Sequence, residues 1–157
     1  MTLHLPDTAA GGTYALLFEL AQPLTLAAGK LGPLRLPAGW AVYVGSAQGP
    51  GGVRARLQRH LRQQKRLHWH IDYLTHCAAV QGCVFVLGPQ PRECLWVQHL
   101  AGLPGASLPA PGFGNSDCRR GCVAHLIHFP PGLPPRLDDF SRGPGLAILP
   151  LPTTAYP

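Results

Sequence analysis

Hydrophobic residues occur in short blocks along the chain, and their spacing predicts the order of the elements. The blocks at residues 13–20, 40–45 and 80–87 are rich in aliphatic and aromatic residues, and each predicts a core strand. Residues 123–129 alternate in part and predict a late fourth strand. Residues 21–39 contain two short apolar pieces around an Ala-Gly-Lys turn, which predicts a small hairpin between the first two core strands.

The pattern becomes helical after residues 49–52, whose sequence GPGG is expected to form a loop. Val53, Leu57 and Leu61 follow at intervals of four residues. This spacing places them on one face of a helix, with basic residues on the other faces.

Two further segments predict short helices. In residues 70–77, Ile71 and Leu74 are expected to face inward. Residues 91–100 begin with a proline, which suits a first helical turn, and Glu93 follows in that turn.

The predicted fold is therefore α+β, with a small, mostly antiparallel sheet of three core strands and one late strand flanked by helices. Residues 12–129 are expected to form this domain. Residues 1–11 are expected to be a loose leader. Residues 130–157 are rich in Pro and Gly and are expected to form an extended or disordered C-terminal tail.

The charge is concentrated in one part of the chain. There are 13 basic and 7 acidic residues, which gives a net charge of +6. Six of the basic residues lie close together, at Arg54, Arg56, Arg59, Arg62, Lys65 and Arg66. A local basic patch of this kind favours a polyanion, and nucleic acid in particular, over a neutral metabolite.

Other features restrict the expected location. The sequence has no apolar run of the roughly 18 residues that a membrane span requires, so no membrane association is expected. The first residues lack the pattern of an export signal. The five cysteines are odd in number, and their spacing is not that of a secreted disulfide framework. A cytoplasmic protein is therefore expected.

Several motifs occur in an order that resembles the GIY-YIG nuclease superfamily. Gly12-Thr13-Tyr14 opens the first strand and Tyr43-Val44-Gly45 ends the second. Arg56 follows on a helix, and Glu93 lies near the start of a later helix. Thr13 and Val44 stand where the superfamily name has isoleucine, and all three residue types are β-branched. This resemblance covers residues 11–102.

A closer resemblance is to the stand-alone, Uri-type branch of these endonucleases, whose members are largely uncharacterised. The shared segments are YVGSA at 43–47, RLQRH at 56–60, HWHIDYL at 68–74, Glu93-Cys94, GFGNSDC at 112–118 and His125-Leu126. At this level the resemblance covers residues 11–129. The loop before the Arg56 helix is longer than in many superfamily members.

The resemblance implies a metal-dependent endonuclease that hydrolyses phosphodiester bonds, with DNA favoured over RNA and a role in DNA repair or processing. Glu93 would hold one Mg²⁺ or Mn²⁺, and Arg56 would hold the scissile phosphate. Tyr14 and Tyr43 would project into the cleft, and Tyr14 is favoured to orient or deprotonate the attacking water. His60, one helical turn beyond Arg56, is the alternative base, since the ordinary histidine pKa is about 6.5. A protein partner that supplies specificity is also possible, because relatives often borrow it from fused domains.

The remaining candidates surround this set. Residues expected to contact nucleic acid are Arg54, Arg59, Arg62, Lys65, Arg66, His68 and His70. His68, His70 and Asp72 alternate, so a strand would place them on one face and a helix would spread them apart. A structural or substrate-positioning role is favoured over metal binding for these three residues.

The late cysteines allow a second kind of site. Cys118, Cys122 and His125 could bind Zn²⁺, with Cys94 or another Cys or His as the fourth ligand. The spacing is not that of a standard zinc knuckle, and free buried cysteine is the favoured interpretation. Two other functions remain open, namely a non-catalytic nucleic-acid-binding module that uses the basic helix and a zinc-stabilised structural domain.

Overall fold

The computed structural model describes residues 5–6, 8–136, 139–140 and 146–150. The elements along the chain are β1 (Gly12–Leu20), β2 (Leu24–Ala27), the 3₁₀ turn η1 (Gly29–Leu31), β3 (Pro33–Leu36), β4 (Gly39–Ala47), α1 (Gly52–Leu61), α2 (His70–Cys77), β5 (Gly82–Leu87), α3 (Glu93–Ala101), β6 (Leu126–Phe129) and β7 (Leu146–Pro150).

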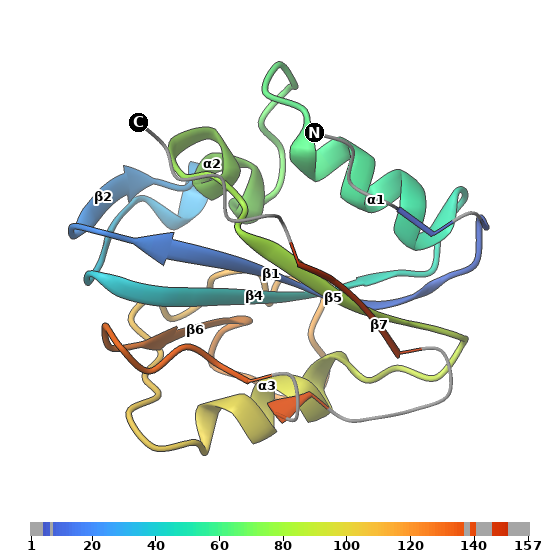
Figure 1. The fold of residues 1–157 in the computed structure, drawn as a ribbon. Coiled ribbons are helices and arrows are strands. Elements are labelled where there is room, and N and C mark those ends of the chain that lie inside the picture. The colour runs from blue at the N-terminus through green and yellow to red at the C-terminus, as the bar shows by residue number, and fades with distance from the viewer. Residues whose placement is uncertain (1–4, 7, 137–138, 141–145, 151–157) are drawn as a thin grey trace.

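The centre of the molecule is an antiparallel sheet with the strand order β6-β4-β1-β5-β7. Helices α1 and α2 lie on one side of this sheet and α3 lies on the other (Figure 1). Strands β2 and β3 form a separate hairpin. The predicted α+β class, with an antiparallel sheet flanked by helices, is confirmed.

The alternation of side chains along the central strands divides the core in two. From β1, Tyr14, Leu16 and Phe18 pack in the cluster that also contains residues of α1 and α2. Ala15 points the other way and packs in the cluster that contains Trp96 of α3. Strands buried on both faces carry nearly continuous hydrophobic runs, which is why the strand signals in the sequence were strong.

Most predicted elements are found with small shifts at their ends. Gly52 is the first residue of α1, although it was assigned to the preceding loop. Helix α3 begins at Glu93, so Pro91 precedes the helix instead of occupying its first turn. Strand β6 begins at Leu126, three residues later than predicted.

The region beyond Phe129 differs most from the expectation. Residues 146–150 form β7, which pairs with β5 at the edge of the sheet and was not among the predicted strands. Phe140 is buried, and its ring lies 5.1 Å from that of Trp96 between centroids. The Pro and Gly content of this region concealed both contributions to the fold. Residues 137–138, 141–145 and 151–157 of the predicted tail lie outside the described residues.

The end of the predicted leader contacts the domain. The backbone N–H of Val53 donates to the carbonyl of Ala10, and the N–H of Gly88 donates to the carbonyl of Gly11. Residues 1–4 and 7 lie outside the description. Within the described residues, no helix has the length and hydrophobicity needed to cross a membrane.

Candidate functional site

Two tyrosines lie side by side on the sheet face that α1 and α2 cover. Tyr14 on β1 pairs with Gly45 on β4, and Tyr43 is two residues before that glycine. The two rings are 6.3 Å apart between centroids. A Cβ at position 45 would lie 2.5 Å from the Tyr14 Oη, so only glycine leaves room for this ring.

His60 fixes the hydroxyl of Tyr14. The Tyr14 Oη lies 2.7 Å from the Nε2 of His60, and both side chains are buried. Burial lowers the pKa of His60 to about 3; the Asp72 charge opposes this shift, and the cations Arg56, Lys65 and Arg59 reinforce it. The imidazole is therefore neutral near pH 7, and its Nε2 is hydrogen-bonded to the Tyr14 hydroxyl. Burial, and then the neighbouring Tyr43, raise the pKa of Tyr14 well above its ordinary value.

Asp72 organises the beginning of α2. Its carboxylate accepts two hydrogen bonds from Arg59, at 2.5 and 2.9 Å, and one each from the backbone N–H groups of His68 and Trp69. Burial raises the pKa of Asp72, but these hydrogen bonds outweigh it and the pKa is lowered. Asp72 Oδ1 is also 4.0 Å from the Nδ1 of His60. Asp72 thus links α1 to α2 behind the tyrosines.

Trp69 carries two arginines with different surroundings. The guanidinium carbons of Arg56 and Arg59 lie 4.4 and 4.3 Å from the centre of a Trp69 ring, which is cation–π geometry. Arg59 is committed to the carboxylate of Asp72. Arg56 has no ion-pair partner among the described residues and lines an open pocket. Its positive charge is therefore available to a ligand.

The pocket has a volume of about 740 Å³ and is lined by residues of β4, α1, α2 and α3 and of the loops between elements. Tyr43 of β4, Arg56 of α1 and Glu93 of α3 all lie on its wall. Tyr14 and His60 are not on the wall and stand behind Tyr43. This placement favours Tyr43 over Tyr14 for direct contact with a bound molecule.

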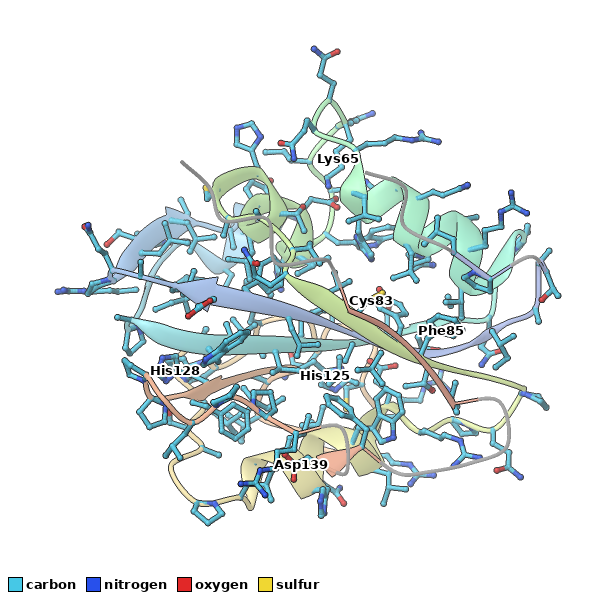
Figure 2. The ribbon with its side chains drawn as sticks, in the orientation of Figure 1. Lys65, Cys83, Phe85, His125, His128 and Asp139 are labelled. Atoms are coloured by element: carbon cyan, nitrogen blue, oxygen red, sulfur yellow. The ribbon has the colours of Figure 1, made fainter. Side chains whose placement is uncertain are left out.

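Glu93 is the first residue of α3, and its side chain is about a quarter exposed. One carboxylate oxygen, Oε1, lies 2.5 Å from the Nδ1 of His125, whose side chain is buried. The contact is not aligned as a hydrogen bond, and both ring nitrogens of His125 lack a hydrogen-bond partner among the described residues. Burial lowers the pKa of His125, but Glu93 and Cys118 outweigh it and the pKa is raised. Figure 2 shows His125 on the α3 side of the sheet and Lys65 on the α1 side.

Four side chains meet on the Glu93 side of the pocket and are called the cysteine cluster below. They are Cys94, Cys118, Cys122 and His125, and their ligand atoms all lie within 4.8 Å of one another. The Sγ atoms of Cys94 and Cys118 are 3.6 Å apart. Burial raises the pKa of Cys118, but the backbone N–H groups of Arg120 and Cys122, with His125 and Cys94, lower it to about 6.

The loop that carries the cluster is held by its own hydrogen bonds. The N–H of Gly112 donates to the carbonyl of Val123, and the N–H of His125 donates to that of Phe113. The Asn115 side-chain amide donates to the carbonyls of Cys122 and Val123. Cys118 and Cys122 are therefore presented from a fixed base.

The structure brings together the five predicted catalytic residues Tyr14, Tyr43, Arg56, His60 and Glu93. Other predicted contact residues are distributed differently. Arg54, Arg62 and Arg66 are exposed. Lys65, like Arg59, is engaged within the protein, and its ammonium donates to the His60 carbonyl and the Thr75 hydroxyl.

His68, His70 and Asp72 do not lie on a strand, because α2 begins at His70. His68 lines the pocket, and the Nδ1 of His70 accepts the N–H of Gly114. These two roles and that of Asp72 differ because the three residues straddle the end of a loop and a first helical turn.

Two basic pocket residues were missed by the sequence interpretation. Arg119 and Arg120 are exposed and line the same pocket as Arg56. They lie on the loop between the two late cysteines. Their position between Cys118 and Cys122 was the available signal, because a loop anchored at both ends presents its intervening side chains.

Comparison with known proteins gives one match. The model of the family described as "Domain of unknown function DUF123" matches residues 13–139. The chain therefore belongs to this family. No curated protein and no solved structure matches the chain.

Proposed function

We propose that this protein is a metal-dependent endonuclease of the GIY-YIG type, in the Uri-type branch, that hydrolyses phosphodiester bonds in nucleic acid. The observation that carries the proposal is the convergence of Tyr43, Arg56 and Glu93 from three separate elements on one open pocket. In this reaction an aromatic hydroxyl, a guanidinium and a carboxylate can position the water, the phosphate and a cation, respectively.

Arg56 binds the scissile phosphate in this proposal. Its guanidinium is stacked on Trp69 and is not neutralised by a carboxylate, so it can form two parallel hydrogen bonds with phosphate oxygens. Arg119 and Arg120 add positive charge on the same pocket. These three residues explain how a chain with few charged residues attracts a polyanion.

The tyrosines position the attacking water. Tyr43 contacts the pocket, and Tyr14 stands behind it with its hydroxyl hydrogen-bonded to the Nε2 of His60. The raised pKa of Tyr14 and the pKa of about 3 for His60 keep this pair neutral. The pair therefore orients the tyrosine hydroxyl groups and does not act as the general base that accepts a proton from the attacking water. In the reaction, the water oxygen bonds to phosphorus and releases one proton to solvent, the bond to the leaving oxygen breaks, and that oxygen takes a proton from solvent.

Glu93 fits a hard divalent cation. Its carboxylate reaches the pocket, and carboxylate oxygen with several waters is the usual environment of Mg²⁺ in nucleotide and nucleic-acid sites. When bound, Mg²⁺ or Mn²⁺ lowers the pKa of water and neutralises charge on the phosphate. Glu93 would hold this cation.

DNA is the favoured substrate, with a role in repair or processing.

A second function, a non-catalytic nucleic-acid-binding module, is supported by one observation. Tyr14, Tyr43 and His60 all have pKa values moved away from neutrality, mainly by burial. None of these three groups is an effective base in the resting site, since general bases work best near the operating pH.

Cleavage assays separate the two functions. Labelled single-stranded, duplex and branched DNA, and RNA of the same sequence, would be incubated with Mg²⁺ or Mn²⁺ and with wild type, Glu93→Ala or Arg56→Ala. We expect metal-dependent cutting by wild type and a loss of at least about 100-fold in both variants, since each removes a group that stabilises the transition state. Glu19→Ala, an exposed carboxylate on β1, is the matched control and should cut normally.

Binding measured by fluorescence anisotropy completes the test. If about five phosphates are contacted, the logarithm of the binding constant should fall with that of salt concentration with a slope of about −4 to −5. Binding without cutting on every substrate would favour the non-catalytic module. Cutting that survives Glu93→Ala would contradict the proposed site.

A further inference from the structure

The cysteine cluster is not used by the proposed reaction, and its chemistry is distinct from that of the Tyr43–Arg56 wall. It contains three thiols and one imidazole, which are soft or borderline donors, whereas Mg²⁺ prefers oxygen. The four residues come from two places in the chain: Cys94 lies in the first turn of α3, and the other three lie in the 112–125 loop, which ends directly before β6. Their convergence depends on the whole fold.

We propose that Cys94, Cys118, Cys122 and His125 form a four-coordinate zinc site that fixes the 112–125 loop to α3 and to β6. Three cysteines and one histidine are a common ligand set of structural zinc sites. Four protein ligands leave no open position, so this ion would hold the loop in place and would not activate water. The inference is independent of the proposed nuclease function.

The distances between the sulfur atoms match two thiolates bound to one shared metal ion and do not match a disulfide bond. Two sulfur atoms bound to one tetrahedral zinc at about 2.3 Å each are about 3.8 Å apart. The Sγ atoms of Cys94 and Cys118 are 3.6 Å apart, far beyond the disulfide length of about 2.05 Å. All four ligand atoms lie within 4.8 Å of one another, so small side-chain rotations are sufficient to enclose the ion.

His125 supplies an independent indication of a ligand. Its ring is buried, 1% exposed, and its Nε2 has no hydrogen-bond partner among the described residues. A buried polar nitrogen without a partner is costly and requires an explanation. Coordination of zinc by Nε2 would satisfy it, and the Glu93 oxygen 2.5 Å from Nδ1 is close enough to accept the Nδ1–H after a small rotation of either side chain. Ligating histidines commonly have a carboxylate in this outer position.

The loop is also prepared for the metal before it binds. Asn115 fixes the carbonyls of Cys122 and Val123, and the N–H of Cys118 donates to the carbonyl of Asn115. The backbone N–H groups of Arg120 and Cys122 approach the Cys118 thiol, where they would stabilise a thiolate ligand. Arg119 and Arg120 lie within this loop, so the zinc would also place two arginines at the pocket.

Metal analysis of the untagged full chain, purified under reducing conditions without added metal, tests the site. We expect about one zinc per chain in wild type and in Cys77→Ser, whose thiol is exposed on α2 outside the cluster. We expect Cys118→Ser to lose the zinc. Glu93→Gln should keep the site but lose about 10- to 100-fold in zinc affinity against a competing chelator, as for other outer carboxylates.

Cobalt spectroscopy on wild type keeps the test valid if Cys118→Ser does not fold. Zinc would be removed with a chelator and replaced by Co²⁺ alone. Thiolate-to-cobalt charge-transfer bands with intense visible bands would show tetrahedral coordination by sulfur. Absence of both zinc and these bands in the reduced protein would overturn the proposal, as would a Cys94–Cys118 disulfide found under the same conditions. An inactive protein that contains one zinc would refute the nuclease function and leave the zinc site standing.

Discussion

His60 and His125 are both fully buried, on opposite sides of the sheet, and their surroundings differ. The Nε2 of His60 is hydrogen-bonded to the hydroxyl of Tyr14. Its Nδ1 has no hydrogen-bond partner among the described residues and lies 4.0 Å from a carboxylate that four hydrogen bonds already fix. His125 has three thiols and one carboxylate around it, and neither of its ring nitrogens is hydrogen-bonded within the described residues. The protein itself supplies a partner for one ring nitrogen of His60, whereas it supplies none for either ring nitrogen of His125 within the described residues. The same residue type therefore supports the fold in one place and indicates a ligand in the other.

Removal of the proposed zinc should have the largest effect and should be confined to the His125 side. Structural zinc contributes about 10 kcal/mol or more in small zinc domains. After treatment with a strong chelator, we expect the amides of Gly112, Cys118 and His125 to lose at least about 100-fold of their protection against hydrogen exchange. The amides of β1 serve as the internal control and should keep their protection. Equal loss throughout the molecule would show that the two sides are not independent.

Asp72→Ala should cause the largest loss of stability on the His60 side. The substitution leaves Arg59 and two backbone N–H groups without their acceptor, and we expect a loss of about 3 kcal/mol in the free energy of unfolding. Urea denaturation measures this value. Asp117→Ala, at an exposed carboxylate near the cysteine cluster, is the control and should change stability by less than about 0.5 kcal/mol. Comparable losses in both variants would contradict the central role of the Asp72 network.

Gly45→Ala should disturb the Tyr14 side without affecting the metal. The new Cβ would lie 2.5 Å from the Tyr14 Oη and 2.6 Å from its ring carbon Cζ, so the ring must move. We expect a loss of about 1–3 kcal/mol from overpacking and weaker cleavage, with unchanged zinc content. Gly49→Ala, where an added Cβ meets nothing within 4 Å, should leave stability and cleavage near wild type.

The pH dependence of stability should report on His60. Its folded pKa of about 3 lies below the ordinary value of about 6.5, so the unfolded chain takes up a proton between these values and the folded chain does not. The contribution of neutral His60 to the free energy of unfolding is fully present above about pH 6.5. It falls by about 1.4 kcal/mol per pH unit as pH decreases toward 3. Burial raises the pKa of the neighbouring Tyr14, and hydrogen bonds lower that of Asp72, so neither group is expected to titrate between pH 5 and 6.5.

Urea denaturation of wild type and His60→Gln at pH 7 and pH 5 tests this assignment. Glutamine keeps an acceptor for the Tyr14 hydroxyl but does not titrate, so the difference in stability between the two pH values should be smaller in the variant. An identical difference in both proteins would assign the acid sensitivity to another group.

The strands and helices of the core could be predicted because their signal is local. The apolar block of β1 and the spacing of Val53 and Leu57 on α1 each indicate which residues are buried. These patterns involve only residues that are close together in the sequence. Strand β7 was missed because five residues between prolines and glycines carry a weak local signal. Its pairing with β5 is decided by the free edge of a sheet more than 50 residues earlier in the chain.

The candidate residues could also be located from the sequence, but their surroundings could not. The ordered motifs located Tyr14, Tyr43, Arg56, His60 and Glu93, and the structure places all five together. The difference between Arg56 and Arg59 depends on Asp72, which lies 13 residues beyond Arg59 and neutralises only that arginine. Tyr14 is buried away from the pocket, whereas Tyr43 lies on its wall. The local sequence pattern predicts neither this difference nor the one between the two arginines.

The sequence by itself determined the alternation that builds a two-faced sheet, the location of the basic helix and the kinds of chemical group available. Tertiary structure alone decided which of these groups share an environment. Cys94 and Cys118 are separated by 24 positions along the chain, and their sulfur atoms are 3.6 Å apart. The physical reason is that hydrophobic burial and helix periodicity depend on near neighbours, whereas charge pairing, desolvation and metal coordination depend on distances that only the folded chain defines.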